Sequence, residues 1–260
     1  MLNFFFRLRR LPWLLGQRLT KEPLNEKSTI SDLFFWRYDN EWDTYIELLD
    51  IAGLFGLDND NKVLLIFFDK NGNRFLEKHI DITLKNRQTI PVSKLISEAV
   101  NYDGKYGTFC VFHKSIPSIV SESNSFITER GYVSYKNSKS PLRSYVHGNL
   151  DAIDNSLKPL GGSSFLYRKF NLQYFLDIGS NYEFVLINVT SSEKKVIYSF
   201  IDPNGNVLIE DSLLLGPLHS HLITTKNFKV PVRLIIKSKM IMARPIVFKL
   251  MPTSFDVFHG

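Results

Sequence analysis

The chain has 260 residues, of which 44% are hydrophobic and 22% charged, a balance typical of a soluble globular protein with one large or two small domains. Its single cysteine, Cys110, excludes an internal disulfide and a thiolate zinc site, and it indicates a reducing compartment or indifference to redox. The net charge of +6 comes mainly from residues 1–21, which have five basic and no acidic side chains; the remaining 27 basic and 26 acidic residues nearly balance, which argues against nucleic-acid binding.

Residues 1–29 form a basic amphipathic segment followed by a linker. The segment is too interrupted by arginine for a transmembrane helix or a signal peptide. One interpretation is a helical segment that lies on an anionic membrane and places a cytoplasmic protein at the membrane periphery. The other is a helix that docks on the protein itself or on another subunit, since an amphipathic face does not identify what it contacts. The membrane interpretation assigns contacts to Phe4, Phe5, Arg7, Arg10, Trp13 and Arg18.

Residues 30–150 have the pattern of a β-sandwich. Apolar and aromatic runs of strand length alternate with clusters of Asn, Asp and Gly, which favour turns. One helix is predicted at 92–100, with Ser93 available as its cap. Cys110 falls inside an apolar run and is predicted to be a core residue. The predicted strands are 45–51, 63–68, 74–82, 107–113 and 125–135.

An internal repeat provides the strongest signal in the chain. The stretch 63–77, VLLIFFDKNGNRFLE, returns 133 residues later as 196–210, VIYSFIDPNGNVLIE, with seven of fifteen positions identical. Asn-Gly between two apolar runs predicts a β-hairpin, because both residues tolerate the positive φ of a tight turn. The repeat therefore predicts a duplicated hairpin within a duplicated domain.

The second copy is predicted at residues 165–252, after a junction at 151–164 that is rich in Pro, Gly and Ser, and before a tail at 253–260. Its predicted strands are 170–177, 182–189, 196–201, 207–215, 219–224, 232–237 and 244–250. The fold class is thus all-β and mainly antiparallel, with two tandem sandwiches. The Asp-x-Asn-Gly hairpins resemble those of immunoglobulin-like sandwiches, which is an analogy of fold and implies no function.

The hairpin turns offer oxygen ligands at Asp69, Asn71 and Asp202, but the spacing of an EF-hand loop is not matched, so structural turns are expected. His219 and His221 could supply half of a metal site and lack an evident third ligand. No metal and no cofactor is therefore predicted. Asn188 matches a glycosylation acceptor by spacing, a match expected to arise by chance.

The most unusual stretch is 131–151, because it has no counterpart in the second copy. If residues 143–151 are extended, one face collects a guanidinium, a phenol, an imidazole, an amide and a carboxylate. The interpretations are a solvated strand face or a ligand site at the domain junction. The site interpretation assigns ligand contacts to Tyr132, Tyr135, Arg143, Tyr145, His147, Asn149 and Asp151.

Three functions follow from these observations. The first is a non-enzymatic binding or assembly module for a carbohydrate or cell-envelope component at a membrane surface. The second is an enzyme acting on a glycan or polar small molecule, with His147 and Asp151 as catalytic residues; a direct dyad would need a bend at Gly148. The third is a structural subunit of a larger particle, with a protein partner on an exposed sheet edge.

Overall fold

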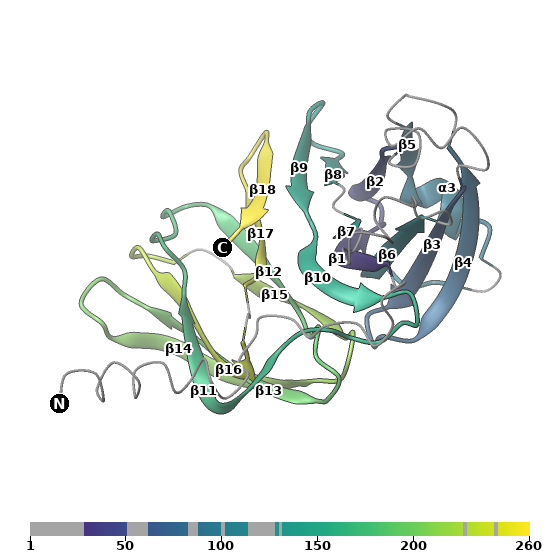
Figure 1. Cartoon of the computed structure of the whole chain (residues 1–260). Coiled ribbons are helices and arrows are strands. Elements are labelled where there is room, and N and C mark those ends of the chain that lie inside the picture. Colours follow the sequence, from purple (N-terminus) through teal and green to yellow (C-terminus); the bar gives the residue numbers. More distant parts are fainter. Residues whose placement is uncertain are drawn as a thin grey trace, which may run out of the picture.

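The computed structural model describes residues 29–50, 62–82, 88–99, 102–113, 128–129, 132–225, 228–241 and 244–260. Nearly all of its regular structure is β, and the strands pair antiparallel except for β1 (Ile30–Arg37) with β7 (Thr128–Glu129) (Figure 1). The predicted all-β, mainly antiparallel class is confirmed. Among these residues no helix has the length and apolar character needed to cross a membrane.

The first half of the chain builds two sheets. One has the order β10-β1-β6-β3-β4 with β7 beside β1, and the other has the order β5-β2-β8-β9. A short helix, α3 (Val92–Ile96), follows β5. The strands are β2 (Trp42–Leu48), β3 (Lys62–Asp69), β4 (Arg74–Asp81), β5 (Gln88–Pro91), β6 (Tyr106–His113), β8 (Tyr132–Asn137), β9 (Arg143–His147) and β10 (Asn149–Asp154).

The second half builds two further sheets, of order β11-β16-β13-β14 and β15-β12-β17-β18. Taken in chain order, these strands occupy the same places as β1-β6-β3-β4 and β5-β2-β8-β9 in the first half. The repeat seen in the sequence thus extends to the order of the strands. The strands of the second half are β11 (Ser163–Asn171), β12 (Asn181–Ile187), β13 (Lys194–Ile201), β14 (Val207–Leu215), β15 (Ser220–Thr225), β16 (Arg233–Met240), β17 (Ile246–Leu250) and β18 (Phe255–His259).

The repeated hairpins, β3–β4 and β13–β14, have the same geometry. In each, the carboxylate of the first Asp accepts the backbone N–H groups two and four residues later, at 2.8–2.9 Å. Gly72 and Gly205 adopt φ of 75° and 88°, a region that favours glycine. These Asp residues are therefore occupied by their own turns, as a structural role requires.

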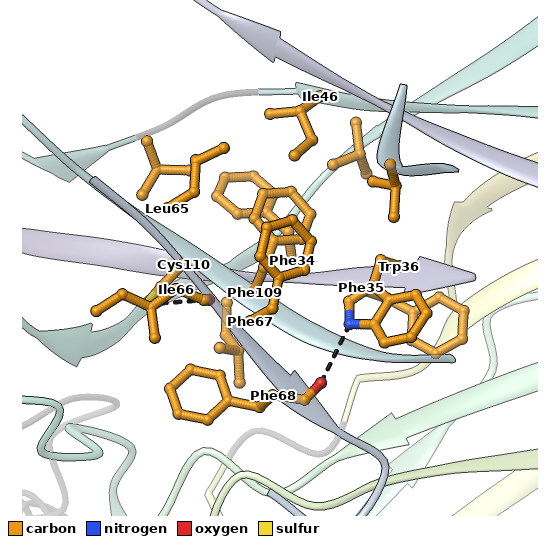
Figure 2. Packing of buried hydrophobic residues seen from close by; sticks show 14 of the residues in the cluster. Phe34, Phe35, Trp36, Ile46, Leu65, Ile66, Phe67, Phe68, Phe109 and Cys110 are labelled. Atoms are coloured by element: carbon orange, nitrogen blue, oxygen red, sulfur yellow. Dashed lines mark hydrogen bonds between the residues drawn. The ribbon is translucent and has the colours of Figure 1, made fainter. Parts of the chain in front are cut away.

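The core of the first half is built around stacked aromatic rings. Phe109 lies between Phe34 and Phe67, with ring centroids 5.0 and 5.3 Å apart (Figure 2). Trp36 is fully buried and its indole N–H donates to the carbonyl of Phe68. Cys110 is buried in the same cluster, and burial raises the pKa of its thiol, so it is a core residue as predicted.

The two halves share hydrophobic packing. On β12 and β17, alternate residues point to opposite faces: Phe184 and Val247 enter the core of the second half, whereas Val185 and Phe248 enter that of the first. Phe248 meets Phe35, Trp42 and Tyr135 at centroid distances of 6.0, 5.3 and 4.9 Å. The sheet β15-β12-β17-β18 is therefore buried on both faces.

Several predicted boundaries differ from the structure. Residues 255–259, predicted as a tail, form β18, which pairs with β17. Residues 151–154, predicted as junction, continue β10, which pairs with β1. The helix at 92–96 begins after Pro91, and Ser93 does not cap it but donates to Asp43 Oδ2 at 2.7 Å. The membrane contacts predicted at 1–21 lie outside the described residues.

Candidate functional site

The predicted row of polar residues at 143–151 is divided at Gly148. Residues before it, in β9, pair with β8, whereas residues after it, in β10, pair with β1 in the opposite sheet. Gly148 is buried, and a Cβ there would lie 2.9 Å from both Asp32 Cβ and Phe34 Cδ1. The chain can cross between the sheets here because glycine alone fits. The extended row assumed from the sequence is thus wrong beyond His147.

Arg143 and Tyr145 do share a face, as alternation predicted. Arg143 Nη1 lies 3.3 Å from Glu47 Oε1, and its guanidinium lies over the rings of Tyr45 and Tyr145, at 4.8 and 5.8 Å. The Glu47 side chain is 3% exposed and also accepts hydrogen bonds from Ser134 and Thr89. Arg143 therefore neutralises a buried carboxylate, which is a structural task.

His147 lies against His259 of β18, with ring centroids 4.3 Å apart. Its Nδ1 donates to the carbonyl of Gly148 at 2.8 Å, and Nε2 of His259 donates to the carbonyl of His147 at 2.9 Å. Burial, followed by the neighbouring His147, lowers the pKa of His259 to about 4. This histidine pair joins the edges of the two halves.

The remaining predicted contacts occupy different environments. Tyr135 is fully buried and donates to the carbonyl of Phe35, so its assignment to ligand binding is wrong. Tyr132 lies opposite His147 in β8, and Asn149 lies opposite Leu33 in β1. Asp151 adopts φ of 47°, and its backbone N–H donates to Asp32 Oδ1 at 2.9 Å. His147 and Asp151 therefore belong to different sheets rather than to one strand face.

Other candidates from the sequence have structural roles. Asn188 is fully buried, and its Nδ2 donates to the carbonyls of Ser192 and Leu215, which leaves no place for a glycan. Within the described part of the chain, no group of three or more His, Cys, Asp or Glu could hold a metal ion.

A cleft of about 500 Å³ opens between the two halves, at the ends of β1, β2, β12 and β17. None of the ligand residues predicted between Tyr132 and Asp151 lines it, although Asn137 and Lys139, at the β8–β9 turn, do. Both halves contribute polar and apolar side chains, so the cleft exists only where they pack together. Its lining comprises Arg37, Asp39, Glu41, Trp42, Asn137, Lys139, Gly179, Asn181, Glu183, Leu250, Met251, Pro252, Ser254 and Phe255.

An ion pair between the halves forms one wall of the cleft. Arg37 Nη1 lies 2.5 Å from Glu183 Oε2, and Nη2 lies 3.5 Å from Asp39 Oδ2. The guanidinium stacks over the ring of Trp42, and Phe255 packs edge-on against that ring, with centroids 4.9 Å apart. Asp39 is held in turn because its Oδ1 accepts the backbone N–H groups of Glu41 and Trp42. These polar side chains are therefore fixed before any ligand arrives.

The outer part of the cleft is more accessible. Glu41 and Lys139 are exposed and pair at 3.3 Å. Asn181 is exposed at the start of β12, and Phe255 is half-buried at the start of β18. From the sequence, Arg37, Asp39 and Glu41 fell within the first predicted sandwich and were assigned no role. Glu183 had no local signal, since its partner is 146 positions away.

The comparisons with known proteins assign no family. No family model matches the chain, and no curated protein matches it. Among solved structures, a beta-glucuronidase from glycoside hydrolase family 2 aligns over 88% of this chain and 23% of its own, at 8% identity and a TM-score of 0.18. A calcium-binding mutant of Bacteroides uniformis beta-glucuronidase 2 aligns over 88% and 25%, at 10% identity and a TM-score of 0.17. The chain spans about a quarter of those proteins, and similarity this low supports no conclusion about activity.

Proposed function

We propose that the protein is a non-enzymatic binding module whose interdomain cleft takes a neutral, hydroxyl-rich ligand of the carbohydrate class. The observation that carries this proposal is the lining of the cleft: planar carboxylate and amide groups beside a partly accessible aromatic ring, held in place by contacts between both halves. Sugars are bound by such groups because hydroxyls need paired donors and acceptors, while the C–H face of the ring packs on an aromatic surface.

The charges of the cleft favour a neutral sugar over an acidic one. Three carboxylates, Asp39, Glu41 and Glu183, face two cations, Arg37 and Lys139. Both cations already pair with carboxylates, so no cation remains to compensate an added anion. An acidic ligand would meet net negative charge in a partly desolvated site, which is unfavourable.

Binding without catalysis is supported by the contacts of the acidic groups. Asp39 and Glu183 both pair with the guanidinium of Arg37, and Asp39 Oδ1 also accepts two backbone N–H groups. A general acid or base must instead be placed to exchange a proton with the ligand. The cleft therefore suits recognition better than acid–base chemistry.

The same proposal includes the arrangement expected from the sequence. The two halves, with their common strand order, are tandem immunoglobulin-like domains, supported by two facing sheets in each. The protein is cytoplasmic and peripheral, and residues 1–21 hold it at an anionic membrane, supported by their five basic and many apolar side chains.

The cleft is tested by titrating the full chain with a panel of neutral and acidic mono- and disaccharides, using isothermal titration calorimetry or NMR shifts. Asn181→Ala and Glu41→Gln should weaken binding of the best neutral sugar by about tenfold each, the cost of a lost polar contact. Asn171→Ala, an equally exposed change in β11, serves as the control. Binding that survives both cleft changes, or that prefers acidic sugars, would refute the proposal.

A second candidate function is assembly into a larger particle. Among the described strands, β14 pairs only with β13 in the sheet β11-β16-β13-β14, so none of them covers its other edge. Four apolar side chains on it are 44–62% exposed: Val207, Leu208, Ile209 and Leu214. An open apolar edge can pair with a strand of another chain. Light scattering of the full chain tests this, because Ile209→Lys should abolish any self-association.

A further inference from the structure

The sheet β11-β16-β13-β14 turns its outer face away from the first half of the molecule (Figure 1). Its inner face supplies the core of the second half, through residues such as Val196, Ile236 and Met240, while the first half packs on the other sheet, through β12 and β17. Among the residues adjacent to these core positions, four exposed lysines point outward: Lys169, Lys195, Lys237 and Lys239, here called the lysine face.

The lysines of this face are brought together by strand register. Lys169 in β11 lies directly opposite Lys237 in β16, and Lys237 lies opposite Ile197 in β13. The next outward positions along β16 and β13 are Lys239 and Lys195. Like charges directly opposite in a sheet are destabilising. The fold therefore gains nothing from this arrangement, which indicates a role in binding.

Acidic compensation is sparse on the lysine face. Within the described ranges, no salt bridge was found for any of its four lysines, whereas Lys62, Lys78, Lys139 and Lys249 elsewhere all have acidic partners. Two acidic side chains of β14 lie near these rows, and both have partners of their own. Glu210, opposite Ser199, accepts from that hydroxyl at 2.8 Å, and Asp211, opposite Tyr198, accepts from that phenol at 3.2 Å. The net charge of the body conceals this local excess, because its acids lie elsewhere.

Apolar side chains project beside the lysines. Phe165, Leu166 and Tyr167, three consecutive residues of β11, are 87%, 68% and 48% exposed. Lys239 Nζ lies 5.9 and 5.7 Å from the ring centroids of Phe165 and Tyr167. At the far side of the face, Leu214 is 62% exposed and lies opposite Lys195. Large exposed apolar groups next to cations mark an interaction surface.

We propose that the lysine face and the apolar residues beside it, Phe165, Tyr167 and Leu214, dock the protein on an anionic lipid bilayer. Lysines would lie at the level of the phosphates, and Phe165 and Tyr167 would enter the boundary between headgroups and acyl chains. Leu214 favours a bilayer over single-stranded nucleic acid, because base stacking uses rings and gains little from leucine. This docking surface is formed by other residues than those of the cleft and of the segment 1–21.

Vesicle co-sedimentation of the full chain tests the proposal, with phosphatidylcholine vesicles that contain none or about 30% phosphatidylserine, a surface that attracts basic side chains. Lys237→Glu/Lys239→Glu should lower the partition coefficient on the anionic vesicles at least tenfold, given roughly fivefold for each lysine near the surface. Phe165→Ser/Tyr167→Ser leaves the net charge unchanged and should also weaken binding to the anionic vesicles. The control, Lys105→Glu/Lys136→Glu, makes the same charge change at exposed lysines of the first half and should bind as the parent does.

Folding and the other membrane segment are controlled in the same series. Lys237→Glu removes the repulsion from Lys169, so its melting temperature should equal or exceed that of the parent. The measurements are repeated with all variants in a chain that lacks residues 1–21, and the lysine changes should weaken vesicle binding there as well. Equal binding of parent and lysine variants in both series would overturn the proposal. So would absent vesicle binding with tight, lysine-dependent binding of single-stranded RNA. Sugar binding in the cleft should be unaffected throughout.

Discussion

The guanidinium of Arg37 and the carboxylate of Glu183 join the two halves of the molecule, with Nη1 and Oε2 2.5 Å apart. Their side chains are only 8% and 13% exposed. Arg37 is further enclosed by the rings of Trp42 and Phe248, at 4.2 and 5.3 Å. A charge so enclosed depends on its partner, because water cannot replace it. The pair therefore determines how the halves meet at the cleft.

Glu183→Gln should destabilise the protein by about 3 kcal/mol, because it leaves the Arg37 charge buried with weaker compensation from Asp39. Urea denaturation of the full chain measures this. The matched control is Asp81→Asn, which removes an exposed carboxylate 3.9 Å from Lys62 and should cost less than about 1 kcal/mol. Equal effects of the two changes would show that the Arg37–Glu183 pair is as weak as a surface pair.

Phe248→Ala should destabilise the first half although Phe248 belongs to the second. The ring is fully buried against Phe35, Trp42 and Tyr135, so its removal should cost about 3–5 kcal/mol. Calorimetry of the parent should show one transition, because the halves share a core. In the variant, the loss of stability should be accompanied by a second unfolding transition, at a lower temperature than the main one. Phe258→Ala, a half-buried ring on the opposite face of the sheet, should lower the melting temperature less and keep one transition.

The repeat allowed the strand order of one half to be anticipated from the other, because hairpins depend on local turn residues such as Asn71-Gly72. The class followed from alternation and composition. The contacts between the halves could not be read in this way. Phe248 and Val185 look like any alternating strand residue, and only the assembled sheet shows that both of its faces are buried. The cleft was missed for the same reason.

The prediction that residues 143–151 form one extended row is wrong because the chain changes sheets at Gly148. Alternation correctly placed Arg143 with Tyr145, since both lie in β9. It could not show that the chain leaves the sheet at Gly148, because the need for glycine arises from Asp32 and Phe34, more than a hundred positions away. The lysine face could not be predicted either, because its four lysines come from three strands, β11, β13 and β16, which only the pairing of these strands brings together.

Stability should fall as the pH is lowered from about 6.5 to about 4, in part because of His259. Its folded pKa is about 4, below the value of about 6.5 expected when unfolded, so the unfolded state binds the proton first. The neutral histidine contributes fully above that window, and protonation removes roughly 3 kcal/mol across it. The urea midpoint should depend less on pH in His259→Gln than in the parent. In His79→Gln, a control change at an exposed histidine, its pH dependence should be that of the parent. Parallel curves for parent and His259→Gln would contradict the assignment.

The two repeated hairpins should respond differently to the same substitution, because among the described residues only the first contacts the other half of the molecule. The carbonyl of Lys70 accepts the backbone N–H of Ser220 at 3.0 Å. A Cβ on Gly72 would lie 2.5 Å from the carbonyl oxygen of Pro217, whereas a Cβ on Gly205 meets nothing within 4 Å. Gly205→Ala should therefore cost only the positive-φ penalty, about 1–2 kcal/mol. Gly72→Ala should cost that penalty and at least about 1 kcal/mol more, since backbone must shift to relieve the contact. Chemical denaturation of the two variants checks the difference. Equal losses of stability in the two variants would show that the contact between the first hairpin and the second half contributes nothing measurable.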